Sequence, residues 1–164
     1  MSEIARIREE IRQAYAGQPW HGPSVGELVT GVDATSAAAR PVPGAHTIWE
    51  LVLHLTAWAH EVTRRLQGGK PGLPPEGDWP PVPQPTGEAW DAALVALRNA
   101  HQELLATVER FPEERLIELV AGTPPGTGVT YYHMLHGLVQ HDAYHGGQIA
   151  LLRKALAAAT QSRD

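Results

Sequence analysis

The chain has 164 residues, 43% of them hydrophobic and 19% charged, which is the composition of a folded globular protein and not of a disordered one. Its net charge is −5 and its basic residues cluster no further than pairs such as Arg64-Arg65, so the sequence argues against nucleic acid as a partner. Cysteine is absent, which excludes disulfides, thiolate metal ligands and a cysteine nucleophile.

The chain begins with an amphipathic helix. Apolar side chains recur at helical spacing over 3–16, and Gly17 and Pro19 end the pattern. The connection that follows is rich in Gly, Pro and Ser, and it carries a short apolar patch over 25–29 and a helical turn near 34–39. We therefore expect one long helix followed by an irregular segment.

The second long helix has clear signals at both ends. Thr47, with Glu50 three residues later, forms a capping box, and Gly68 and Gly69 close the pattern. The apolar stripe between these signals predicts a helix over 48–66.

The segment over 68–87 is an extended connection, because it holds half of the 14 prolines without any collagen-like period. At roughly 3 Å per residue it can cross the full length of a helix of about 30 Å. A third helix is predicted over 86–111. A short helical turn and the loop over 121–128 then lead to Thr130, which caps a fourth helix that runs to about residue 159.

These elements predict an all-α fold, because no strand pattern competes with the helical ones. Four long helices with one long crossover indicate a four-helix bundle in a single domain over 1–164. The Pro-rich crossover lets the second and third helices run parallel, so the sequence is compatible with up-down-down-up order.

Histidine is the enriched reactive residue, with nine copies, and two of them lie on the stripe of the fourth helix that faces the core. On a helical wheel, His141 and His145 share this stripe with Leu138 and Ile149, one turn apart, so their imidazoles can converge on one metal ion. His54, at the edge of the core stripe of the second helix, can supply a third nitrogen. The sequence offers no fourth protein ligand, which leaves a position for water or substrate.

An alternative interpretation is that these imidazoles are core groups satisfied by hydrogen bonds, and for His54 alone it is the favoured one. A buried pair of imidazoles without a metal needs partners for four ring nitrogens, which favours a ligand role for the pair on the fourth helix. Gln148 can hydrogen-bond an imidazole or a metal-bound water from outside the ligand shell. Gly146 and Gly147 fit either close helix packing or the approach of a substrate.

The remaining histidines are predicted to be surface, capping or interface residues, although His46 can approach the mouth of the site. In particular, His101 is placed on a solvated face of the third helix. Asp142 projects about 100° away from His141 around the fourth helix, so it is not expected to be a ligand. The six histidines in this group are His21, His46, His60, His101, His133 and His136.

Two segments carry a resemblance to a known family. The sequence IWELVLHLTAWAHEV surrounds His54, and GLVQHDAYHGGQIALLRKA surrounds His141 and His145 and is close to the signature HDxYHxGQI. With these segments the chain resembles the DinB/YfiT-like family of bacterial metal-binding four-helix bundles. The resemblance implies an up-down-down-up bundle, a homodimer, and a divalent metal, zinc or nickel, on the three histidines with water completing the shell. The Pro-rich crossover has no counterpart that we can align.

The resemblance leaves three functions open. Relatives include S-transferases and isomerases that use a low-molecular-weight thiol, so a metal-dependent transferase of a small-molecule substrate is the first. A metal-dependent hydrolase is the second, but Glu50 and Glu61 are weak candidates for its general base. The third is a non-catalytic, metal-stabilised dimeric stress protein, for which apolar residues outside the main stripes, such as Trp49 and Leu135, suggest a second subunit or the middle of the bundle. With no signal peptide and no apolar run of membrane length, we expect a cytoplasmic protein without a membrane partner.

Overall fold

The computed structural model describes residues 1–124, 126 and 128–161, so residues 125 and 127 of the predicted loop over 121–128 lie outside the described residues. The described part is all-helical apart from one isolated β-bridge between Leu119 and Thr130. The elements are α1 (Glu3–Ala16), α2 (Val25–Val29), α3 (Ala34–Ala38), α4 (Ile48–Leu66), α5 (Gly87–Glu109), the short 3₁₀ helix η1 (Glu113–Ile117) and α6 (Tyr131–Gln161).

Capping side chains fix the ends of the long helices where the sequence predicts them. The Thr47 side chain accepts from the Glu50 amide at 3.1 Å while the Glu50 carboxylate accepts from the Thr47 amide, which completes the capping box of α4. Thr86 caps α5, and the Thr130 hydroxyl accepts an amide proton in the first turn of α6. Gly68 leaves α4 with a φ of +93°, which glycine adopts without strain. The four predicted long helices are confirmed, and the apolar patch over 25–29 is itself the short helix α2.

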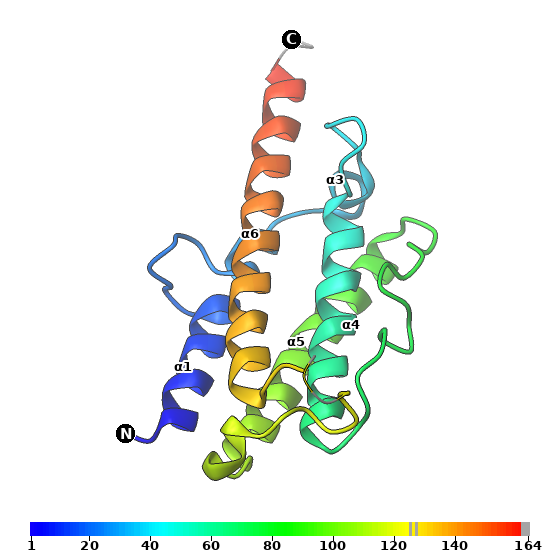
Figure 1. Ribbon diagram of the computed structural model, residues 1–164. Helices are drawn as coiled ribbons and strands as arrows, with labels where there is room; N and C mark the ends of the chain where they lie inside the picture. Colours follow the sequence, from blue (N-terminus) through cyan, green and yellow to red (C-terminus); the bar gives the residue numbers. More distant parts are fainter. Residues whose placement is uncertain (125, 127, 162–164) are drawn as a thin grey trace.

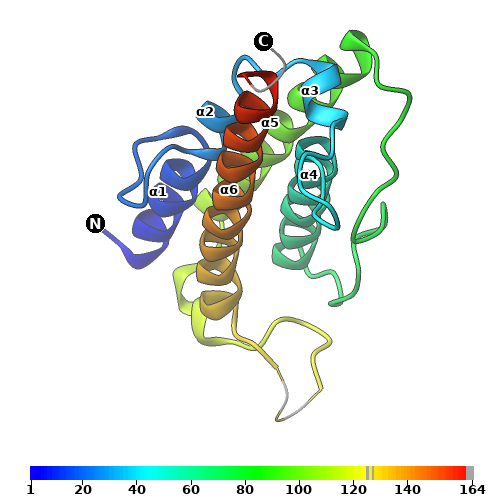
Figure 2. The same ribbon diagram turned by 90° about the horizontal axis from the view of Figure 1, so that it is seen from above.

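The bundle has up-down-down-up order. Figure 1 shows α1 and α6 running upward and α4 and α5 running downward, while the crossover climbs beside α4 to reach the start of α5. The view from above places the same crossover along the outside of α4 (Figure 2). The Pro-rich segment therefore connects the parallel helices α4 and α5, as its length allows. Within the described residues, no helix combines the length and apolar character that crossing a membrane requires.

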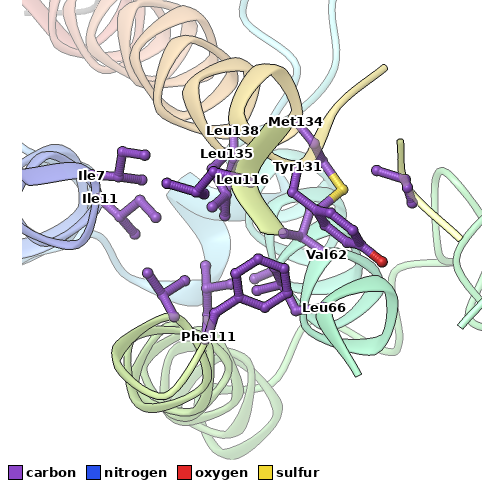
Figure 3. Packing of buried hydrophobic residues seen from close by; sticks show 14 of the residues in the cluster. Ile7, Ile11, Val62, Leu66, Phe111, Leu116, Tyr131, Met134, Leu135 and Leu138 are labelled. Carbon is purple, nitrogen blue, oxygen red and sulfur yellow. The ribbon is translucent and has the colours of Figure 1, made fainter. Parts of the chain in front are cut away.

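The core consists of two apolar clusters stacked along the bundle axis. On α6 the lower cluster extends to Leu138 and the upper cluster begins at Ile149, so His141 and His145 lie between them. On α4 His54 lies next to Leu55, at the lower end of the upper cluster. Figure 3 shows residues of the lower cluster, among them Ile7, Ile11, Val62, Leu66, Phe111, Leu116, Tyr131, Met134, Leu135 and Leu138.

Two apolar residues outside the main helical stripes, Trp49 and Leu135, are part of this single-chain core. Trp49 is fully buried with its ring 5.1 Å from that of Trp90, and Leu135 is fully buried in the lower cluster. Their apolar character is thus explained by the middle of the bundle and needs no second subunit. The homodimer stays a prediction.

Candidate metal centre

The three predicted histidines lie together. His54 comes from α4 and His141 and His145 from successive turns of α6, and one ring nitrogen of each lies within 4.8 Å of the other two. The Nε2 atoms of His54 and His141 are 2.9 Å apart, and the three ring centroids are separated by 4.5 to 4.9 Å. A cluster of this kind can hold a metal ion.

Hydrogen bonds on the far side of two rings leave their Nε2 atoms as lone-pair donors. His54 Nδ1 lies 2.6 Å from the carbonyl oxygen of Asp78, and His145 Nδ1 lies 2.8 Å from Oε1 of Gln148. Both partners are acceptors, so we assign the proton of each ring to Nδ1. Gln148 thus makes the contact to an imidazole that the sequence suggested. This is the outer-shell arrangement that orients metal-binding histidines.

The donor set fits a divalent cation. Without a cation, the Nε2 atoms of His54 and His141 face each other, so one of the two must carry a proton and donate it. If His141 donates, its Nδ1 becomes a buried acceptor, and that atom has no hydrogen-bond partner among the described residues. With zinc–nitrogen bonds of about 2.0–2.1 Å, ligand nitrogens in a tetrahedral site lie about 3.3 Å apart, so the 2.9 Å pair needs only a small opening. Three imidazole nitrogens suit zinc, nickel, copper, cobalt or iron.

Burial keeps the imidazoles of His141 and His145 neutral. Removal from water, together with the neighbouring His145, lowers the pKa of His141 to about 4. Burial also lowers the pKa of His145, although the hydrogen bond to Gln148 opposes that shift. At neutral pH these lone pairs are available to a cation without competition from protons.

The Pro-rich crossover covers the centre, which the sequence did not predict. Trp79 stacks on the His54 ring at 4.0 Å and 10°, and His46 stacks on Trp79 at 3.5 Å and 4°. The Trp58 indole donates to Oδ1 of Asp78 at 2.8 Å and so holds the crossover against α4. The sequence did not identify Asp78 and Trp79, because no short-range sequence pattern predicts where an extended segment packs against a distant helix. His46, which the sequence placed within reach of the site, contacts it only through Trp79 and does not line the cavity.

A cavity of about 510 Å³ opens beside the three histidines. Its walls are largely apolar, with Trp58, Leu138 and Met134 among them, and such a lining with a few polar groups is typical of small-molecule sites. The lining residues are His54, Trp58, Val62, Arg65, Asp78, Trp79, Val129, His133, Met134, Gly137, Leu138, His141 and His145. His133, predicted to be a surface, capping or interface residue, lines the cavity because the space extends two turns down α6 from His141.

The paired glycines of α6 do not line this cavity. A Cβ at Gly146 would lie 3.5 Å from Leu28 and 3.8 Å from Val25, at ordinary contact distance, so this position faces α2, and Gly147 is exposed. Gly137 lines the cavity instead, and a Cβ there would meet nothing within 4 Å. Of the two interpretations of the glycine pair, helix packing is the one that the contacts of Gly146 support.

A family model described as DinB superfamily matches residues 24–149. The chain belongs to the DinB superfamily. The match contains all three clustered histidines, which confirms the family resemblance read from the two motifs. Neither the search of curated proteins nor that of solved structures found a match.

His101 of this DinB-superfamily chain is fully buried, so its placement on a solvated face was wrong. Its Nδ1 lies 3.0 Å from the Leu97 carbonyl oxygen, its Nε2 lies 3.3 Å from Oδ2 of Asp142, and its ring stacks on Tyr15 at 4.0 Å. The polar neighbours in sequence concealed a spacing of four residues from Leu97 and three from Leu104, which puts His101 on the core stripe of α5. Asp142, which was not expected to be a metal ligand, contacts His101 instead.

The two glutamates considered as bases lie outside the cavity. Glu61 is fully buried, and although burial raises its pKa, hydrogen bonds from Arg64 and Arg65 outweigh that effect and lower it. Glu50 caps α4 and accepts from Arg40 at 2.9 Å. Both carboxylates are committed to structural contacts.

Proposed function

We propose that this protein is a divalent-metal-dependent enzyme that transfers a low-molecular-weight thiol to a small electrophilic substrate. His54, His141 and His145 hold the metal, with zinc or nickel the best match to three imidazoles. The observation that carries the proposal is the position of the histidine cluster at the border of a cavity of about 510 Å³, which has room for an organic molecule.

The residues of the chain orient the metal ligands, bind the substrate and exclude water. A divalent cation, when bound, lowers the pKa of a thiol that reaches it. The Asp78 carbonyl and the Gln148 side chain hold two of the imidazoles in place, and Trp79 stacks on the His54 ring. The apolar walls bind the organic part of the substrate and keep water from competing with the thiol.

The lining of the cavity favours transfer over hydrolysis. Among its described residues there is no Ser, Thr, Tyr or Lys to act as nucleophile, and the one carboxylate, Asp78, accepts from Trp58 through Oδ1. Hydrolysis needs a general base for water, and Glu50 and Glu61 are committed elsewhere. A thiol brings its own nucleophile: transfer forms one carbon–sulfur bond, and the thiol proton and the leaving group of the electrophile depart.

A non-catalytic, metal-stabilised dimer is the less favoured alternative, because a purely structural metal site is normally closed by protein ligands. The three-histidine cluster instead borders open space. The homodimer and the cytoplasmic location are proposed on the family resemblance and on the sequence, respectively.

The test begins with metal content measured by ICP-MS on untagged protein. We expect about one equivalent of zinc or nickel per chain, lost in His141→Ala and retained in His136→Ala, a control on the same helix outside the cluster. The metal-loaded protein should then consume glutathione or bacillithiol in the presence of 1-chloro-2,4-dinitrobenzene, and His141→Ala should not. Wild-type protein that stays metal-free after reconstitution would refute the metal centre, and a loaded protein without turnover across a panel of thiols and electrophiles would favour the structural role.

A further inference from the structure

The cavity has a second polar end, away from the cluster of His54, His141 and His145. Arg65 on α4 and His133 on α6 line it, and neither belongs to the histidine cluster. At about 1.5 Å per residue, positions 54 and 65 are about 16 Å apart along α4, and positions 141 and 133 about 12 Å apart along α6. The cavity is therefore elongated parallel to the bundle axis.

Arg65 is held rigidly in this wall. Its side chain is 13% exposed, its Nε donates to Oε1 of Glu61 at 2.6 Å, and its Nη2 donates to the Gly72 carbonyl at 2.8 Å. Its guanidinium also lies over the Trp58 ring, 5.5 Å from the ring centroid. The group is thus preorganised, which reduces the entropy cost of binding a ligand.

The charge at this end is unbalanced. Glu61 is fully buried and pairs with both Arg65 and Arg64, the latter at 2.8 Å, so two cations share one carboxylate. The cluster carries one surplus positive charge in a chain whose net charge is −5. Between it and the histidines the walls are apolar, formed by Val62, Met134 and other side chains. A surplus cation at the end of a largely apolar cavity attracts an organic anion.

We propose that the cavity binds an elongated, mainly apolar organic anion whose carboxylate or sulfonate meets Arg65 while its other end reaches the histidine cluster. The assignment of that other end as the reacting one rests on the proposed function. Recognition of the anionic end does not rest on the proposed function, because it depends only on Arg65 and the apolar walls.

The test uses two fluorescent probes that differ by one sulfonate group, 8-anilinonaphthalene-1-sulfonate and N-phenyl-1-naphthylamine. The zinc-reconstituted protein should bind the sulfonate at least about tenfold more tightly than the neutral probe. Arg65→Gln should weaken sulfonate binding by about ten- to hundredfold and leave binding of the neutral probe unchanged. Arg64→Gln is the matched control, because it removes the same surplus charge from the Glu61 cluster but does not line the cavity. It should weaken sulfonate binding clearly less than Arg65→Gln, since only Arg65 can contact the sulfonate.

A blocking variant shows where the probes bind. Gly137→Leu adds a side chain where a Cβ meets nothing within 4 Å, and leucine favours the helix, so the variant should fold and lose both probes. 4-Phenylbutyrate, an elongated apolar carboxylate, should displace the sulfonate probe from the wild type. Equal losses in Arg64→Gln and Arg65→Gln, no preference for the sulfonate in the wild type, or unchanged binding to Gly137→Leu would overturn the proposal. His141→Ala should keep the preference for the sulfonate probe. A failure of the metal-dependent activity can therefore be distinguished from a failure of anion binding.

Discussion

Replacing His101 by leucine should destabilise the protein strongly, because it leaves the Asp142 carboxylate in the core without its partner. Asp142 is 1% exposed, and its Oδ1 already lacks a hydrogen-bond partner among the described residues, so the 3.3 Å contact of Oδ2 with His101 is the one that compensates its burial. The His101 ring lies between two acceptors, the Leu97 carbonyl oxygen and this carboxylate.

Removing one member of such a buried pair costs about 3–5 kcal/mol. For a chain of this length, each kcal/mol lost from the free energy of unfolding lowers the melting temperature by about 3 °C. We therefore expect the melting temperature of His101→Leu to decrease by about 10–15 °C. His136→Leu is the matched control: its Nδ1 also faces a carboxylate, Glu10 at 3.2 Å, but that carboxylate is half exposed and the pair is worth less than about 1 kcal/mol.

Thermal melts by circular dichroism on the metal-free protein measure both variants. The double variant His101→Leu with Asp142→Leu should recover much of the lost stability, because an apolar pair of similar volume avoids burying the charge. Equal decreases for His101→Leu and His136→Leu, or a double variant less stable than His101→Leu alone, would show that the buried pair is not the source of the effect.

Two further predictions concern the metal centre. Gln148→Leu removes the acceptor of His145 and should weaken zinc binding by about tenfold or more in a competition titration, whereas Gln140→Leu, at an exposed position of α6, should not. The metal-free protein should lose stability as the pH falls from about 6.5 to about 4, because in this window the unfolded chain takes up a proton at His141 that the folded chain, with its pKa lowered to about 4, does not. Thermal melts across that range should show a loss of about 2–3 kcal/mol in the free energy of unfolding. The loss should be smaller in His141→Ala, and an identical pH profile in the variant contradicts the assigned cause.

Local patterns were sufficient for the helices and for the histidine cluster. Helix ends depend on neighbours three or four residues away, so Thr47, Thr86 and Thr130 could be identified as caps from sequence. The pair on α6 was equally accessible, because residues four apart on an apolar stripe share one face. The third histidine could be proposed because α4 has its own core stripe, and the length of the crossover made the parallel arrangement of α4 and α5 feasible.

What surrounds these residues depended on contacts between distant segments. The return of the crossover past α4 brings Asp78 and Trp79 onto His54, and the packing of α1 and α6 against α5 buries His101 beside Asp142. The cavity and its second end at Arg65 likewise arise between helices. The sequence by itself determined which residues each helix presents to the interior, because helical periodicity is a property of neighbours along the chain. Only the tertiary structure decided which of those faces meet, because that depends on the packing of all the elements together.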